Sequence, residues 1–145
     1  MNLTEQDLEV LVRMVWDALL PGEEGGLVLQ PESEFGEAGY VSEIDVSGEW
    51  NVKVTFECTE VIAQSVASAM FALGPESLSQ ADLDDAVAEV VNQIGGNVKG
   101  TASGHCDLSL PRVEHQPTLV PHDDDGLTVS FLVGDSPFRV HVGAA

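Results

Sequence analysis

Apolar side chains recur at helical spacing in three segments of the chain, at residues 4–20, 59–73 and 79–101. Thr4 and Ser79 are residue types suited to cap the start of the first and the third segment. Pro21-Gly22 stops the first pattern and Gly74-Pro75 closes the second, because neither pair favours a continuing helix. The sequence therefore predicts three amphipathic helices.

Alternating apolar and polar residues on both sides of Ser47-Gly48-Glu49 are typical of a β-hairpin. The predicted strands are residues 40–46, 50–57, 106–110, 127–133 and 138–142, with at most a short strand at 27–29. Residues 22–39, rich in Gly, Glu and Pro, are predicted to form a loop, and a proline-punctuated segment from Pro111 to Pro121 separates two later strands. This order of elements predicts an α+β fold, with a mainly antiparallel sheet packed against helices on one side.

The chain has 145 residues, 43% of them hydrophobic, which is the size of one ordinary domain, so we expect a single domain over residues 1–145. Its core should need neither a metal nor a disulfide. The formal net charge of −20, from 25 acidic and 5 basic residues, argues against nucleic acid and anionic membrane as partners. The charge alone indicates no function, because general acidity for solubility and a specific basic partner both remain open.

The first residues, MNLTEQDLEV, lack the basic start and the uninterrupted apolar core of a secretory signal. No apolar run approaches the roughly 20 residues of a membrane span, so we expect a cytoplasmic protein. Cys58 and Cys106 have no close metal-type spacing, and in a reducing compartment we expect both to be small apolar core residues.

Soft-metal candidates are few and poorly spaced. His105, Cys106, His115 and His122 fit no zinc-ligand pattern. The run Asp123-Asp124-Asp125-Gly126 lacks the alternating ligands and the closing Glu of an EF-hand loop, so we expect a solvated turn there. The chain also contains no Gly-x-Ser-x-Gly elbow, phosphate-binding loop with lysine or dinucleotide fingerprint. We therefore predict no metal and no cofactor in this chain.

Residues 88–100, AEVVNQIGGNVKG, place two adjacent glycines in a well-patterned helix, where each costs about 1 kcal/mol relative to alanine. The apolar residues form one stripe, and Asp85, Glu89, Asn92 and Gly96 fall on the opposite side. Glu89 and Asn92 are three residues apart, so they offer a carboxylate and a carboxamide in nearly the same direction. Gly96, one turn further, would let the backbone of a partner come close.

The alternative for Glu89 and Asn92 is that they are ordinary solvated helix residues, which the geometry alone does not exclude. Asn97 differs because it falls at the margin of the apolar stripe, where a buried amide would have to be hydrogen-bonded. We expect a structural role for Asn97 rather than a catalytic one.

The sequence Glu89-Val90-Val91-Asn92, followed by Gly95-Gly96-Asn97, resembles the E-x-x-N … G-N helix of the CheC/CheX/FliY family of chemotaxis phosphatases. Its surroundings are also similar and come in the family's order: a hairpin VSEIDVSGEWNVKVTFE, a helix EVIAQSVASAMFALG, an acidic lead-in DLDDAVAE and a strand ending in LSLPRV. The resemblance covers roughly residues 38–142 and implies the CheX-like fold. The single copy of the motif points to the CheX-like branch.

In that family the substrate is the aspartyl phosphate of a CheY-type response regulator. The resemblance implies that Asn92 orients the attacking water and that Glu89 pairs with the invariant lysine of the receiver. Asp85 and Gly96 would then contact the partner beside this pair. A carboxamide suits the task because it can position water without adding charge next to the phosphate. The receiver would supply the Mg²⁺, and this chain would hold no cofactor.

Family members with two sites carry a second motif on the first helix. When Val15 is placed opposite Val91, Arg13 and Trp16 stand where the second Glu and Asn would be, so one site is expected. The resemblance further implies a homodimer formed by pairing sheet edges, and the strands LTVSFLV and FRVHV would leave an unpaired edge in a monomer. The charge of −20 on each chain opposes such self-association.

Two alternatives stay open at this point. One is a non-catalytic module with the same fold, which binds a receiver or takes part in a flagellar-switch-like assembly. The other is that the acidic loop 22–39 covers or reshapes the docking face.

Overall fold

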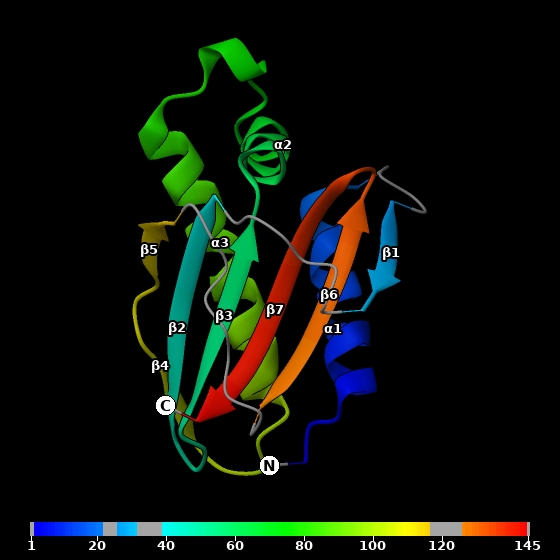
Figure 1. Ribbon diagram of the computed structural model, residues 1–145. Helices are drawn as coiled ribbons and strands as arrows, with labels where there is room; N and C mark the ends of the chain where they lie inside the picture. The colour runs from blue at the N-terminus through cyan, green and yellow to red at the C-terminus, as the bar shows by residue number, and fades with distance from the viewer. Residues whose placement is uncertain (1, 22–25, 32–38, 117–125, 145) are drawn as a thin grey trace.

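The computed structural model describes residues 2–21, 26–31, 39–116 and 126–144. Within these ranges one antiparallel sheet carries helices against one of its faces (Figure 1). This arrangement confirms the predicted α+β class with helices on one side of the sheet.

All three predicted helices are present: α1 (Glu5–Leu19), α2 (Glu60–Phe71) and α3 (Gln80–Gly100). Thr4 and Ser79 form capping boxes with the aspartates three residues later, so two backbone N–H groups at the start of each of α1 and α3 are satisfied. Helix α2 ends short of the predicted Leu73, because Ala72 adopts the left-handed backbone conformation (φ 55°) and leads the chain out of the helix.

The strands are β1 (Leu27–Gln30), β2 (Tyr40–Gly48), β3 (Val52–Cys58), β4 (Cys106–Leu108), β5 (Arg112–His115), β6 (Leu127–Val133) and β7 (Ser136–Ala144). Their order across the sheet is β1-β6-β7-β3-β2-β4, β5 also pairs with β2, and all pairings are antiparallel. The sequence pattern did not predict β5, because this strand has only four residues and directly follows Pro111. A proline at the start of an edge strand removes no ladder hydrogen bond.

The predicted unpaired edge at the C-terminal strands is wrong. Strand β7 lies between β6 and β3, and the outer side of β6 pairs with β1 in the register Leu29↔Phe131 and Gln30↔Ser130. Alternation along the chain shows that a segment is a strand with one buried face, but it carries no information about its neighbours. Among the described strands, the outermost are β1 on one side and β4 and β5 on the other.

The core lies between the sheet and helices α1 and α3. Figure 1 shows both helices behind the sheet, with α2 beyond one end of it. Alternate residues of the central strands point toward the helices and are fully buried, as Ile44, Phe56 and Val140 illustrate. Trp16 of α1 is 2% exposed and stacks on Phe138 of β7, with their ring centroids 4.8 Å apart. These contacts fix α1 and α3 on the sheet.

Both cysteines belong to this core, as the sequence predicts. Cys58 and Cys106 are free and buried. Burial, and to a smaller extent the negative charge of Glu57, raises the pKa of the Cys58 thiol. A thiol that resists ionisation in this way is a poor nucleophile, so Cys58 has a packing role.

Candidate functional site

Helix α3 presents the four predicted site residues to solvent together. Its buried side packs against the sheet and the other helices through Leu83, Ala86, Val87, Val90, Val91, Ile94, Gly95 and Val98. On the opposite side Asp85 and Gly96 are exposed, and Glu89 and Asn92 are partly exposed. We refer to Asp85, Glu89, Asn92 and Gly96 as the α3 face. Because the helix is capped at its start and packed along its whole length, this face is a rigid support.

The Glu89 side chain is held in place by a neighbour that the sequence analysis did not identify. Gln93 Nε2 donates a hydrogen bond to Glu89 Oε1 at 2.7 Å. The spacing of four residues along a helix is the signal from which this contact can be predicted. One oxygen of the Glu89 carboxylate is thus engaged, and the side chain has a defined direction.

Asn92 differs from Glu89 because its side chain makes no hydrogen bond to the described residues. The side chain is partly exposed. A carboxamide carries both a donor and an acceptor group. Asn92 therefore has both groups available for water or for an incoming protein.

Asn97, predicted at the margin of the apolar stripe, has an exposed side chain rather than a buried one. Its amide is nonetheless hydrogen-bonded, since Asn97 Nδ2 donates to the backbone oxygen of Gln93 at 2.8 Å. This bond stays within the helix, which agrees with the structural role expected for Asn97.

The two adjacent glycines of α3 have different environments. A Cβ atom on Gly95 would lie 2.7 Å from Cγ2 of Ile44 in β2, so Gly95 allows the helix to approach the sheet closely. A Cβ atom on Gly96 would meet only Cδ1 of Leu108, at an ordinary distance of 4.0 Å. Packing explains Gly95, but no contact in the described chain requires a glycine at position 96.

Helix α1 offers no comparable pair at the positions compared above. Trp16 points into the core, as its burial shows. Arg13 donates to Glu9 Oε2 at 3.0 Å and to the backbone oxygen of Leu27 at 3.2 Å, which ties α1 to β1. Neither residue is available as a solvent-facing carboxylate or carboxamide.

The acidic segment 22–39 lies partly outside the described residues, which omit 22–25 and 32–38. Within it, Leu27–Gln30 form β1, at the end of the sheet next to β6, and Gly39 directly precedes β2. Helix α3 instead packs on β2 and β3, toward the other end of the sheet. Strand β1 therefore lies across the sheet from the strands on which α3 packs.

The metal candidates do not come together in the described part of the chain, where no group of three or more His, Cys, Asp or Glu side chains is arranged to hold an ion. His105 contacts Asp107 at 3.1 Å, and His115 contacts Asp84 at 2.8 Å and Gln80 at 3.3 Å. His122 and residues 123–125 lie outside the described ranges. Across those ranges, no helix has the length and apolar character needed to cross a bilayer.

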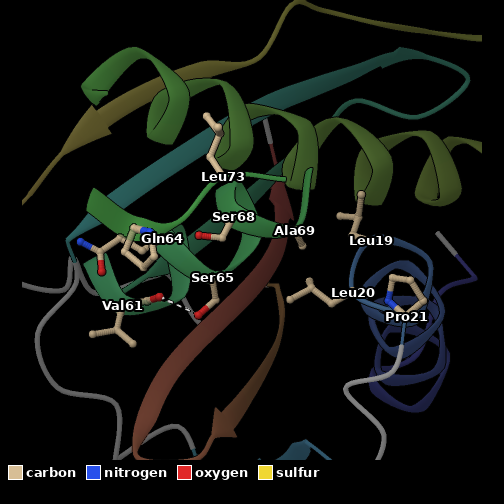
Figure 2. Close-up of a pocket in the computed structure, with 10 residues that line it drawn as sticks. Leu19, Leu20, Pro21, Val61, Gln64, Ser65, Ser68, Ala69 and Leu73 are labelled. Carbon is tan, nitrogen blue, oxygen red and sulfur yellow. Dashed lines mark hydrogen bonds between the residues drawn. The ribbon is translucent and has the colours of Figure 1, made fainter. Parts of the chain in front are cut away.

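A pocket of about 670 Å³ lies between the end of α1 and α2 (Figure 2), and none of the four residues of the α3 face lines it. Its lining consists of Leu19, Leu20, Pro21, Val61, Gln64, Ser65, Ser68, Ala69, Leu73 and Pro75. None of these side chains is charged, and the hydroxyl of Ser65 donates to the backbone oxygen of Val61 within its own helix. The pocket holds no acid, base or activated nucleophile, so the α3 face is the better candidate for a chemical role.

Comparison with known proteins is consistent across sequence and structure. The sequence profile of the chemotaxis phosphatase CheX family matches residues 40–132. Comparison with curated protein sequences gives no significant match. The matched residues begin with β2, include the whole of α3 and end inside β6.

Solved structures with the same fold include a CheX protein, a CheX–CheY complex and FliY. The chemotaxis protein CheX from Vibrio vulnificus is 13% identical with a TM-score of 0.74, and the alignment covers 98% of this chain and 99% of that one. A CheX–CheY–BeF3–Mg²⁺ complex from Borrelia burgdorferi matches at 17% identity and a TM-score of 0.68, covering 94% of each chain. FliY from Thermotoga maritima matches at 13% identity and a TM-score of 0.56, covering 100% of this chain and 93% of that one.

These likenesses in structure establish the CheX/CheC-like fold, and the sequence match extends over the helix that carries Glu89 and Asn92. The chain therefore belongs to the CheX family of chemotaxis phosphatases.

Proposed function

We propose that this protein hydrolyses the aspartyl phosphate of a CheY-type response regulator in the cytoplasm, with Asn92 orienting the attacking water. The observation that carries the proposal is the α3 face itself. On the exposed side of a rigid helix it combines the Glu89 carboxylate, oriented by a hydrogen bond from Gln93, with the Asn92 carboxamide, which makes no hydrogen bond within the described residues. A solvent-facing helix with this pair is suited to enter the site of another protein rather than to enclose a small substrate.

Asn92 acts as a positioning group for water. Its carboxamide oxygen accepts a hydrogen bond from the water, which places the water oxygen in line with the phosphorus–oxygen bond to the aspartate. The water oxygen bonds to phosphorus as that bond breaks, and the products are inorganic phosphate and the free aspartate. Because the carboxamide is neutral, it adds no repulsion beside the negatively charged phosphoryl group.

Glu89 aligns the two proteins. Its carboxylate pairs with a lysine of the receiver, and the Gln93 hydrogen bond holds it in a defined direction before the partner arrives. Asp85 and Gly96 lie beside the pair and border the same contact. The receiver supplies the Mg²⁺ that neutralises the phosphoryl oxygens. The Borrelia burgdorferi CheX was solved with CheY, BeF3 and Mg²⁺, and this supports the same kind of partner here.

The decisive experiment mixes a phosphorylated receiver from the same organism with this protein and follows the loss of phosphate over time. We expect loss to be faster than from the receiver alone, at catalytic ratios of this protein to receiver. Loss at the unassisted rate, together with formation of a complex, would instead support a non-catalytic receiver-binding module. Neither hydrolysis nor a complex would exclude both functions for the receiver tested.

A further inference from the structure

Of the five basic side chains in this acidic protein, four form ion pairs with carboxylates of the described residues. The pairs are Arg13 with Glu9 at 3.0 Å, Lys53 with Glu43 at 3.6 Å, Arg112 with Asp45 at 3.1 Å and Arg139 with Glu57 at 2.9 Å. Lys99 is the fifth, and no carboxylate of the described residues lies within ion-pair distance of it. In a chain with 25 acidic residues, this lysine is left available for a group outside the molecule.

Lys99 extends the α3 face toward the end of the helix. It lies seven residues after Asn92 and fourteen after Asp85. A step of seven residues along the helix falls about 20° short of two full turns. The side chains of Asp85, Asn92 and Lys99 therefore point in nearly the same direction from the helix. The Cα atoms of Asn92 and Lys99 are about 10.5 Å apart along the helix axis at the usual rise per residue.

Gly96 leaves the surface between Asn92 and Lys99 open. Side chains on a helix lean toward its N-terminus, so Lys99 covers the turn that contains Gly96. Position 96 has no side chain to block that path, and packing does not explain its glycine. An ammonium group on this flexible stem can therefore reach an anion bound beside Asn92.

We propose that Lys99 determines specificity on the α3 face by pairing with an anionic group of the phosphorylated partner beside Asn92. This inference rests on the function proposed above. The anion is either the phosphoryl group itself or a carboxylate at the rim of the phosphorylated site. The lysine offsets the repulsion that Asp85 and Glu89 exert on such a group, because it is the one basic residue of α3.

The test replaces Lys99 with Glu, Met and Arg and measures kcat and KM for dephosphorylation of the receiver. We expect Lys99→Glu to raise KM by about tenfold or more with kcat within about twofold of the original, because an interprotein contact is reversed in sign. Lys99→Met should have a smaller effect in the same direction, and Lys99→Arg should keep KM nearly unchanged. The difference between Lys99 and Lys99→Glu should shrink as salt is raised.

Lys53→Glu is the matched control, since it changes the net charge by the same amount on β3, away from the α3 face. Its KM should stay close to that of the original protein. Dissociation constants for the receiver with and without BeF3 separate the two anions. An effect of Lys99→Glu only with BeF3 assigns the phosphoryl group, and an equal effect in both states assigns a carboxylate.

An unchanged KM for Lys99→Glu in an active protein overturns this inference and leaves the proposed phosphatase function intact. The same rise in KM for Lys53→Glu also overturns it, because the effect is then one of net charge. A lower unfolding midpoint for Lys99→Met with unchanged KM would assign Lys99 to the stabilisation of the helix C-terminus instead. Failure of the original protein to bind or dephosphorylate any receiver removes both proposals together.

Discussion

Arg139 and Glu57 stand directly opposite each other on β7 and β3 and form a two-pronged ion pair. Arg139 Nε donates to Glu57 Oε1 and Nη2 donates to Oε2, each at 3.0 Å. Their side chains are only 2% and 1% exposed. They alternate with the residues that face α1 and α3, so they lie on the other face of the sheet. A charge pair removed from water in this way holds the two strands in register.

Replacing one partner of this ion pair by a neutral residue should strongly destabilise the protein. We expect Arg139→Met to lower the free energy of unfolding by about 3–5 kcal/mol, because it removes the guanidinium that forms two hydrogen bonds with the buried Glu57 carboxylate. Urea unfolding measures the change. The control is Arg112→Met, whose ion pair with Asp45 is 45% and 34% exposed and should contribute no more than about 1 kcal/mol. Equal losses of unfolding free energy in Arg139→Met and Arg112→Met would contradict the prediction that the buried ion pair matters more than the exposed one.

The adjacent glycines of α3 should respond in opposite ways to alanine. Gly95→Ala should lower the free energy of unfolding by about 1–3 kcal/mol, because the added methyl group collides with buried Ile44. Gly96→Ala should raise it by up to about 1 kcal/mol, because the site is open and alanine favours the helix. Denaturant unfolding of both variants tests the pair.

If Gly96 serves docking, its alanine variant should be more stable and yet less effective, with a several-fold lower kcat/KM toward the phosphorylated receiver. Full activity in a stabilised Gly96→Ala protein would remove the docking role of this glycine.

Substitutions at Asn92 and Glu89 should affect phosphate hydrolysis and receiver binding differently. We expect Asn92→Ala to abolish turnover with little change in the dissociation constant for the receiver, because it removes only the group that positions water. Glu89→Ala should also weaken binding, since a charge pair between the proteins is lost. Phosphate release and a binding assay on the same preparations measure the two effects. Asp17→Ala, exposed on α1, is the control and should change neither. Full activity in both site variants would place the chemistry elsewhere on the protein.

We also propose a homodimer, formed at a different edge from the one that the sequence pattern suggested. Strand β1, at one edge of the described sheet, has Val28 and Leu29 exposed at 57% and 48% on its two faces, and pairing with a copy of β1 would partly cover both side chains. Because each chain carries a charge of −20, association should strengthen as salt screens the repulsion. Sedimentation at several ionic strengths tests this, with Val28→Lys as the variant expected to dissociate. A monomer mass at low and high salt in the micromolar range would exclude the dimer.

Local signals were sufficient for the helices and for the content of the candidate site. The capping residues Thr4 and Ser79 and the spacing of apolar positions predicted α1 and α3 within one or two residues, because caps and helical periodicity depend on neighbours along the chain. The same periodicity placed Glu89 and Asn92 together on the exposed side of α3. Their presentation to solvent is therefore a property of the sequence, whereas their chemical role remains a proposal.

The strand order and the meaning of the glycines were decided by contacts between distant segments. Whether β6 ends the sheet depends on a four-residue strand about a hundred residues earlier, and no local pattern encodes that pairing. Helical periodicity placed Gly96 on the exposed side of α3, but only the close approach of Ile44 from β2 shows that Gly95 is required for packing. Side-chain periodicity specifies which face of an element is buried, and the tertiary structure alone specifies what lies against it.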